Sequence, residues 1–436
     1  MSKRPQESDI EFIKALAGLL RENDLTEIEV NRDYGDDDTL TVRVARQATV
    51  VAAPAPQPVT QLKPKAKPKP KPPIREWALS DDPTPSFQPE TFFTTAKASE
   101  RYAKIMDAGG WPKVPGNVGP QTKGPAVAAL RRRLEIEGDP AESVPPGDSW
   151  DAQLTAAVKH YQARNGLRQT GAVSGATLRA INTPASVRFK QLASSSQRLA
   201  GVEFPFGDRY VVVNIPSAAV EAIENGHVVK RYVAVVGDVD HRSPEVTAKI
   251  TAVNLNPTWT LPTSIIKNEI IPKMQRDPGY LARSRIKILD NHGAVIDPRS
   301  INWSSERAAN YTLRQDSGTH NALGSIRIQM NNKYAVYMHD TPSKGFFNRD
   351  YRFLSHGCVR VQGVYDLAAW LLEGSGSWDR TSLMAQIGRD RQDLRLAKPT
   401  PVVWVYMTGW ASADGTVHFA DDVYQVDAIG LQASAR

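Results

Sequence analysis

The residues best suited to chemistry lie in one segment, Tyr337–Val361, which contains the single cysteine of the chain, Cys358, and two of its eight histidines. A thiol attacks a carbonyl carbon only as the thiolate, and an ordinary pKa of ~8.5 leaves little thiolate at neutral pH. A neighbouring imidazole or another positive partner must therefore activate it. His339 and His356 are the candidates, so the segment predicts nucleophilic acyl-transfer chemistry.

The residues around Cys358 fit the same chemistry. In an extended strand His356, two residues earlier, would lie on the same face as the thiol, whereas His339 can meet it only through folding. Gly357 permits a close backbone approach, and free amides here can face a developing oxyanion. Arg360 can pair with a substrate carboxylate in a forked geometry.

A purely structural role is the alternative interpretation. A lone cysteine is often a small buried hydrophobe, and paired histidines often only satisfy hydrogen bonds in a core. The combination Ser-His-Gly-Cys-Val-Arg, downstream of His-Asp-Thr-Pro, favours catalysis over that alternative.

Length and composition set wide bounds. A chain of 436 residues allows about three domains. Its net charge of +7 is mild and comes partly from a Lys/Pro run, so we expect no nucleic-acid partner. One cysteine excludes an intramolecular disulfide. No cluster of His, Asp, Glu and Cys has the spacing of metal ligands, so we expect neither a metal nor another cofactor.

Strand patterns surround the segment that contains Cys358. Polar and apolar residues alternate within three successive segments that are joined by short polar turns: 209–216, 218–226 and 227–237. This pattern predicts a meander. Later elements are expected as strands at Gly324–Met330, Tyr334–Met338, Val359–Val361 and Val402–Met407 and a helix at Val364–Leu372. Residues 264–320 are polar with weak strand signals and indicate an inserted subdomain or lid.

Helical patterns precede the strands. One helix is expected at Ala96–Ala108, and residues 124–183 predict three more. Apolar side chains recur there at helical spacing, with Asn165-Gly166 as a stop and Ser174 as a cap: Val127, Leu130, Leu134, Leu154, Val158 and Tyr161. This region resembles the three-helix peptidoglycan-binding module of wall enzymes, through the pattern from Tyr161 to Leu167. An ordinary helical spacer is the alternative.

The N-terminal region predicts a separate unit. Residues 8–20 indicate a helix, and Thr26–Val30 and Thr39–Val44 indicate two strands. This stretch resembles the N-terminal segment of biotin carboxyl carrier proteins, but the biotinyl domain is missing, so biotin carriage is not implied and a fusion is indicated. Residues 48–75 alternate proline with alanine or lysine, which predicts an extended spacer.

Targeting signals are not visible in the sequence. No apolar run approaches the ~18 residues of a membrane span. Charged residues interrupt the apolar ones in residues 1–23 at helical spacing, so this stretch does not predict a signal peptide.

Ser355–Arg360, together with His339, resembles the signature of the YkuD-type L,D-transpeptidase catalytic domain. Residues 256–265 (NPTWTLPTSI), followed by Glu269, and residues 321–328 (NALGSIRI) resemble the large subfamily with a peptidoglycan-binding module and a lid. The resemblance implies an α+β chain, with a mixed β sandwich-like catalytic domain, a lid insertion and a small three-helix domain. It also implies a periplasmic location.

The resemblance implies a role for each motif residue. Cys358 matches the nucleophile and His339 the general base. Asp340 would orient the imidazole through its backbone carbonyl, and the amides of Gly357 and Cys358 would form the oxyanion hole. The other residues would shape the substrate pocket, with a structural role as the alternative for the last two: His356, Ser355, Arg360 and Tyr337.

The implied reaction is a two-step acyl transfer between peptidoglycan stem peptides. Cys358 would form a thioester with a donor tetrapeptide, and the amine of a second stem would resolve it to a 3→3 cross-link. Carbapenem β-lactams are implied as covalent inhibitors. With water as acceptor the enzyme would be an L,D-carboxypeptidase, and with a protein amine it would anchor envelope proteins. A non-enzymatic scaffold, with residues 1–47 docked on a carboxylase partner, is a further alternative.

We therefore expect five segments along the chain. They are a helix–hairpin unit at 1–47, a linker at 48–78, a partly helical lead-in at 79–117, a peptidoglycan-binding-like helical domain at 118–200 and a catalytic domain at 205–425, with the lid at about 264–320.

Overall fold

The computed structural model describes residues 27–33, 39–45, 75–138 and 145–427. The chain divides into two compact units, Met1–Pro72 and Pro73–Arg436. In the first unit β1 (Glu27–Asp33) pairs antiparallel with β2 (Thr39–Ala45), which confirms the two expected strands with β1 longer by three residues at its end. The helix expected at residues 8–20 lies outside the described residues.

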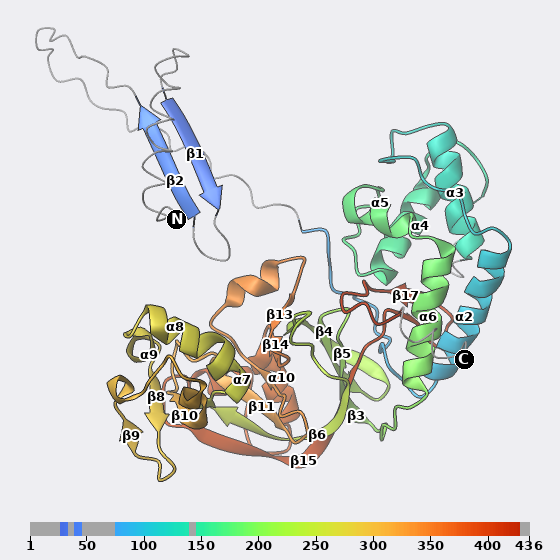
Figure 1. The fold of residues 1–436 in the computed structure, drawn as a ribbon. Coiled ribbons are helices and arrows are strands. Elements are labelled where there is room, and N and C mark those ends of the chain that lie inside the picture. The colour runs from blue at the N-terminus through green and yellow to red at the C-terminus, as the bar shows by residue number, and fades with distance from the viewer. Residues whose placement is uncertain (1–26, 34–38, 46–74, 139–144, 428–436) are drawn as a thin grey trace, which may run out of the picture. The chain divides into compact units, whose positions relative to one another are not determined.

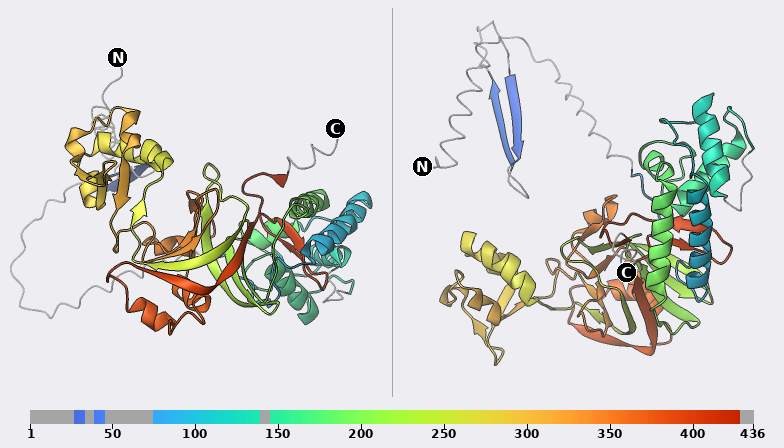
Figure 2. Two further views of the ribbon diagram at one scale, coloured as in Figure 1. Left: turned by 90° about the horizontal axis from the view of Figure 1, so that it is seen from below. Right: turned by 45° about the vertical axis from the view of Figure 1, so that its right-hand side comes forward.

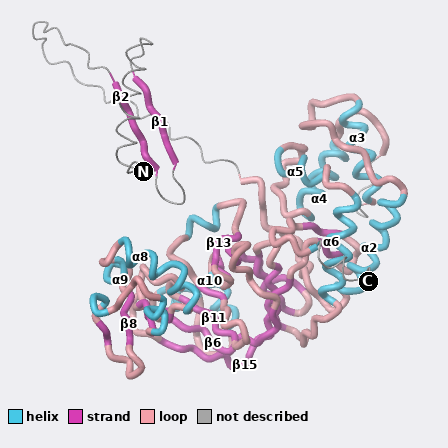
Figure 3. Tube along the Cα trace, in the orientation of Figure 1, coloured by secondary structure: helices cyan, strands magenta, loops and turns pink. Residues whose placement is uncertain are grey.

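Five helices open the second unit and gather on one side of its large sheet (Figures 1 and 3). They are α2 (Thr91–Asp107), α3 (Pro125–Glu137), α4 (Ala152–Arg164), α5 (Gly175–Ile181) and α6 (Ala185–Leu199). The expected apolar stripe of α3 and α4 is confirmed, because Val127, Leu130, Leu154 and Val158 are fully buried in one cluster. Ser174 is the N-cap of α5, but its side chain makes no capping bond.

Two helices differ from the sequence expectation. α2 begins at Thr91, five residues before the expected start, and α6 was not expected. The face that α6 buries mixes Leu192 and Leu199 with Ser194 and Ser195, which weakens the apolar stripe in its sequence. The hydroxyl of Ser195 instead accepts a hydrogen bond from the amide of Thr408 at 3.1 Å. Tertiary hydrogen bonds therefore replace part of the apolar pattern that would have revealed this helix.

The large sheet has nine strands and mixed parallel and antiparallel pairing. Its order is β13-β5-β14-β12-β11-β6-β15-β3-β4, and β4 also pairs with β5, so the strands close into a ring. The bounds are β3 (Arg209–Asn214), β4 (Ala219–Glu224), β5 (His227–Gly237), β6 (Val246–Leu255), β11 (Ile326–Met330), β12 (Met338–His339), β13 (Phe353–Ser355), β14 (Val359–Val361) and β15 (Gln392–Val405).

The meander β3–β5, strand β14 and α10 (Val364–Leu371) confirm the sequence expectation closely. The centre of β3 is a continuous apolar run because both faces are covered: Val211 and Val213 enter one core, and Val212 enters another. The C-terminal hairpin of β16 (Gly409–Ala411) and β17 (Val417–Phe419) packs against the helices.

Two strand expectations have wrong bounds, and one strand was not expected. The strand expected at Tyr334–Met338 is only the two residues of β12, because Ala335 has a φ of +54° and the side chain of Asn332 bonds to the backbone of Val336. β15 begins at Gln392 rather than Val402, with a register shift between Arg395 and Thr400. β6 was missed.

The insertion after β6 has its own sheet, contrary to the weak strand signals of its sequence. Four short strands pair in the order β7-β10-β8-β9. Figure 2 shows this insertion set to one side of the large sheet. Its elements are β7 (Trp259–Thr260), α7 (Thr263–Ile265), η1 (Ile266–Ile270), α8 (Ile271–Arg276), α9 (Tyr280–Arg283), β8 (Ile286–Leu289), β9 (Val295–Ile296), η2 (Pro298–Ser300), η3 (Glu306–Asn310) and β10 (Thr312–Gln315).

The insertion is held by a small core of its own, which includes Ile266, Leu281 and Leu313. Its longest strands, β8 and β10, have four residues each, too few to show a clear alternation in sequence. In the part of the chain that the structure describes, the helices are all too short or too polar to cross a membrane.

Candidate active site

The parallel pairing of β12 with β14 positions the candidate catalytic residues. Met338 pairs with Val359 and His339 pairs with Arg360. Cys358, which precedes Val359, therefore lies beside Tyr337 and on the same sheet face as His339, because side chains two residues apart share a face. The two parts of the predicted site thus meet on neighbouring strands, although they are far apart in sequence.

A row of polar residues crosses this face of the sheet. Arg360, His339, Arg327 and Asn254 are successive cross-strand partners, and Asp393 follows. Nε of Arg327 donates to Asn254 at 2.9 Å, and the amide of Asn254 donates to Asp393 at 2.7 Å. Two guanidinium groups therefore flank the imidazole of His339 across the strands.

His339 is buried, and the carbonyl oxygen of Asp340 lies 2.5 Å from its Nδ1. A carbonyl only accepts hydrogen bonds, so this contact assigns the proton to Nδ1 and leaves Nε2 as an acceptor. Burial lowers the pKa of His339 to about 3, the charge of Arg360 lowers it further, and main-chain bonds to Asp340 and Leu323 oppose these effects. The ring is therefore neutral at neutral pH.

The thiol of Cys358 is partly exposed and packs against the main core. Burial raises its pKa to about 11, while a backbone hydrogen bond from Tyr337 and the charges of Arg360 and Arg327 oppose the rise. The resting pair is thus a neutral thiol and a neutral imidazole. From the sequence, we expected a thiolate already formed beside an imidazole. With both groups neutral at rest, the thiol must instead lose its proton during the attack.

The residues just before Cys358 form a turn, not the extended strand assumed from the sequence. β13 ends at Ser355, and Gly357 has a φ of +100°, a conformation that favours glycine. The carbonyl of Gly357 accepts a hydrogen bond from Ser243 at 2.8 Å, and the hydroxyl of Ser355 donates to the carbonyl of Cys358 at 2.5 Å. These bonds hold the turn that presents the thiol.

His356 leaves the face of Cys358 and contacts the insertion. Its Nε2 lies 2.8 Å from the carboxylate of Glu269, which also accepts from Lys273 at 3.0 Å. The hydrogen bond to His356 is the main reason that the pKa of Glu269 falls to about 2; burial opposes it, and Lys273 adds to it. The ring of His241 lies 4.5 Å from that of His356, centroid to centroid. The insertion therefore touches the motif directly.

Tyr337 is the other contact between site and insertion. Its ring lies 5.8 Å from that of His339, and Trp259 at the start of the insertion forms a side-chain hydrogen bond with it. Burial raises the pKa of Tyr337, so its hydroxyl stays protonated. The charge of Arg327 lies 5.4 Å from the centre of the same ring.

The side chains of Asp340 and Arg360 contact neighbouring loops of the domain. The carboxylate of Asp340 accepts from the amide of Ser325 at 3.1 Å and pairs with Lys344, so it fixes the loop before β11. Arg360 lies over the ring of Phe346 at 5.6 Å, and burial lowers its pKa.

The sequence did not single out Arg327, Asn254 or the contact made by Glu269. Glu269 and Arg327 lie within or beside segments whose pattern was noted, but only the strand register shows that Arg327 is the partner of His339. Within the described ranges, no group of three or more His, Cys, Asp or Glu side chains could hold a metal ion.

Comparison with protein families agrees with this geometry. Residues 208–387, which contain the paired strands and the whole candidate site, match the YkuD family, the L,D-transpeptidase catalytic domain. The chain contains an L,D-transpeptidase catalytic domain. Residues 123–181, which include α3 to α5, match the family described as "Putative peptidoglycan binding domain".

A curated protein of Haemophilus influenzae, described as "Putative L,D-transpeptidase", is 34% identical over 239 residues. The match covers 55% of this chain and 48% of that protein, so the chain spans about half the length of this relative.

Solved structures of L,D-transpeptidases are also similar to the chain. One from Mycobacterium smegmatis is 16% identical, covering 45% of this chain and 58% of that one, with a TM-score of 0.23. One from Stackebrandtia nassauensis is 11% identical, covering 67% and 96%, with a TM-score of 0.26. At these TM-scores the structures add nothing to the assignment, which rests on the family match and the sequence motif.

Proposed function

We propose that the L,D-transpeptidase domain joins two peptidoglycan stem peptides through a thioester on Cys358. The observation that supports this most is the register of β12 and β14, which sets His339 and Cys358 on one sheet face. A neutral imidazole with Nε2 unprotonated is the form that a general base requires.

In the first step the thiol attacks the amide carbonyl between the L-centre of diaminopimelate and the terminal D-Ala of a donor tetrapeptide. Nε2 of His339 takes the thiol proton, and the tetrahedral oxyanion faces the amides of Gly357 and Cys358. As the carbon–nitrogen bond breaks, the imidazolium gives that proton to the departing amine of D-Ala. A thioester remains on Cys358.

In the second step the side-chain amine of another stem attacks the thioester carbonyl. His339 removes a proton from that amine and returns it to the sulfur as the carbon–sulfur bond breaks. The products are a 3→3 cross-link and the free thiol. The raised pKa of Cys358 also makes the sulfur a poor leaving group until it is protonated, which gives His339 a role in both steps.

Two guanidinium groups supply positive charge beside the reacting atoms. Arg327 and Arg360 both lower the pKa of Cys358 against the effect of burial. The same charges can hold stem carboxylates, because guanidinium pairs with carboxylate in a forked geometry. We assign them to donor-stem positioning.

The insertion acts as a lid in this proposal. Its Glu269 binds His356, and its Trp259 binds Tyr337, so both contacts lie next to the nucleophile. A lid closed in this way excludes water and favours an amine acceptor over hydrolysis. With water as the acceptor the same thioester would give an L,D-carboxypeptidase, and with a protein amine it would anchor envelope proteins.

The test is incubation with disaccharide-tetrapeptide, with and without an added amine acceptor, followed by mass spectrometry. Cross-linked dimer is expected from the wild type, and none from Cys358→Ala. Unchanged dimer formation by Cys358→Ala would refute the proposal, and release of D-Ala without dimer would favour the carboxypeptidase. Acylation of Cys358 by a carbapenem, detected by intact mass, is expected as a second readout.

The boundaries and location belong to the same proposal. We assign residues 118–200 to peptidoglycan binding, 205–425 to catalysis and 264–320 to the lid, and the periplasm as the place of action. Deletion of residues 1–75 is expected to leave turnover unchanged, and cell fractionation of the full-length product tests the location.

A further inference from the structure

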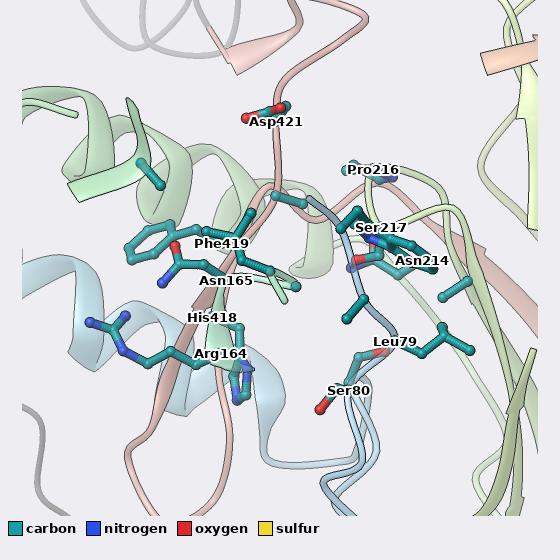
Figure 4. A pocket seen from close by; sticks show the side chains of 18 of the residues that line it. Leu79, Ser80, Arg164, Asn165, Asn214, Pro216, Ser217, His418, Phe419 and Asp421 are labelled. Carbon is teal, nitrogen blue, oxygen red and sulfur yellow. Dashed lines mark hydrogen bonds between the residues drawn. The ribbon is translucent and has the colours of Figure 1, made fainter. Parts of the chain in front are cut away.

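A cavity whose lining includes neither Cys358 nor His339 lies between the helices and the large sheet. Its volume is about 560 Å³, within the range of small-ligand sites, which are often found between domains. In Figure 4 Arg164 and Asn165, at the end of α4, lie across it from Asn214 and Ser217, at the turn after β3. One wall thus belongs to the residues matched as peptidoglycan-binding and the opposite wall to those matched as catalytic.

The lining of this cavity combines aromatic faces with polar groups. Trp77, Tyr351 and Phe419 line it, and Tyr351 is 49% exposed, so the cavity opens to solvent there. Asp421 is exposed at the wall, and Ser217 accepts a bond from Asn214 while its own hydroxyl proton can still be donated. The exposed aromatic face of Tyr351, beside single donors and acceptors, suits a ring that has hydroxyl groups on its edge and C–H groups on its face.

The charges around the cavity nearly cancel. Five carboxylate residues and five arginines line it, and lysine is absent from the lining. Several are paired with each other, such as Arg231 with Glu221 and Arg179 with Glu76. Burial lowers the pKa of His418 to about 4, so its ring adds no charge at neutral pH. A balanced lining disfavours a polyanion and suits an uncharged, strongly hydrogen-bonding ligand.

The cavity is connected to the active-site turn by one short strand. Arg352 and Phe353 line the cavity, and β13 then runs to Ser355, just before the turn that holds Cys358. The six steps along the chain from residue 352 to residue 358 span at most ~22 Å. A stem tetrapeptide reaches ~14 Å when extended, and its link to the sugar adds to that reach. A glycan held in the cavity can therefore bring its own stem toward the thiol.

We propose that this cavity binds a disaccharide unit of the peptidoglycan glycan strand, made of N-acetylated amino sugars, and so positions the donor stem for Cys358. The proposal rests on the proposed function for the identity of the polymer. It assigns the glycan to the junction of the two domains, where neither alone would form the site.

The probe is the peptide-free disaccharide of N-acetylglucosamine and N-acetylmuramic acid, with its lactyl carboxyl group capped as an amide so that it is uncharged, titrated by calorimetry or by ligand-observed NMR into the full chain. Saturable binding is expected for the wild type. Tyr351→Ala removes an exposed aromatic face and is expected to weaken binding about fivefold. Ser217→Trp fills the cavity and is expected to weaken binding by about tenfold or more.

The matched control is Tyr334→Ala, since Tyr334 has a similar exposed fraction, 47%, and lies outside the cavity lining. Its disaccharide affinity should equal that of the wild type. Unfolding midpoints and carbapenem acylation of Cys358 show whether Ser217→Trp is folded, and Tyr351→Ala keeps the test valid if it is not.

Absence of saturable binding by the wild type, or equal weakening in Tyr334→Ala and Tyr351→Ala, would overturn the proposal. Binding of a free stem tetrapeptide in place of the disaccharide would overturn it too. Disaccharide binding without any acyl-enzyme would refute the proposed function and leave this site standing, whereas acyl-enzyme without disaccharide binding would do the reverse.

Discussion

The site under the insertion and the cavity beside the helices are built in opposite ways. His339, Cys358 and Arg360 come from two adjacent strands and one turn, and the strand register alone sets their relation. The cavity is lined by many separate stretches of chain between Glu76 and Val423. Reacting atoms need a fixed geometry, and paired strands supply it. A binding surface can instead be formed by residues from many segments.

The two regions also differ in charge. Around the thiol, Arg327 and Arg360 face one side of the sheet, where Asp393 supplies a carboxylate in the same cross-strand row. In the cavity acids and arginines occur in equal number. The first arrangement suits developing negative charge on a reacting group, and the second suits neutral recognition.

The largest expected effect separates chemistry from binding. Cys358→Ala should reduce cross-linking by about 10³-fold or more, because no nucleophile remains to form the thioester. Disaccharide affinity, measured in parallel, should not change. A loss of affinity equal to the loss of turnover would show that the two regions are not distinct.

The next effect concerns the general base. His339→Gln should slow acylation by a carbapenem about 10²- to 10⁴-fold, since proton transfer from the neutral thiol is lost. The matched control is His418→Gln, because His418 is also buried with a lowered pKa but lies in the cavity lining. Rates are followed by intact mass. Equal slowing in both variants would point to a general loss of packing.

The motif around Cys358 made the proposed nucleophile, its proposed base and the backbone carbonyl of Asp340 accessible from sequence, because these residues lie within one segment of the chain. The bend at Gly357 was not foreseen, since a positive φ depends on the contacts with Ser243. Arg327 could be placed only from strand register.

The long-range features escaped the sequence for other reasons. α6 buries serines among its leucines, and the partners of these serines lie in the C-terminal hairpin region, so its apolar pattern is weak in the sequence. The strands of the insertion are too short for periodicity to show. The cavity has no motif, because its lining residues become neighbours only in the folded chain.

A third prediction concerns acid stability. The unfolded pKa of histidine is ~6.5 and that of buried His339 is about 3, so between these values the unfolded chain binds more protons. The free energy of unfolding should fall by about 1.4 kcal/mol per pH unit per such histidine as the pH drops. In His339→Gln the contribution of residue 339 to this pH dependence should vanish, while the contribution of His418 remains. Urea unfolding at pH 6 and pH 5 tests this, and identical slopes in the two proteins would contradict it.

The smallest effect tests the lid. Glu269→Gln weakens the contact with His356, so the ratio of hydrolysis to cross-linking should rise about threefold as water gains access. Glu306→Gln is the control, because Glu306 also pairs with a lysine of the insertion, at 3.1 Å, but is 84% exposed. The ratio of hydrolysed to cross-linked product is measured by mass spectrometry. The same rise in both variants would show that Glu269 has no special role in the lid.

The most direct test of the central claim is the intact mass of the protein after brief exposure to disaccharide-tetrapeptide without an added acceptor. A covalent adduct equal in mass to the donor minus D-Ala is expected, mapped to Cys358 by peptide digestion and strongly reduced in His339→Gln. An adduct on another residue, or dimer formation with no thioester at Cys358, would contradict it.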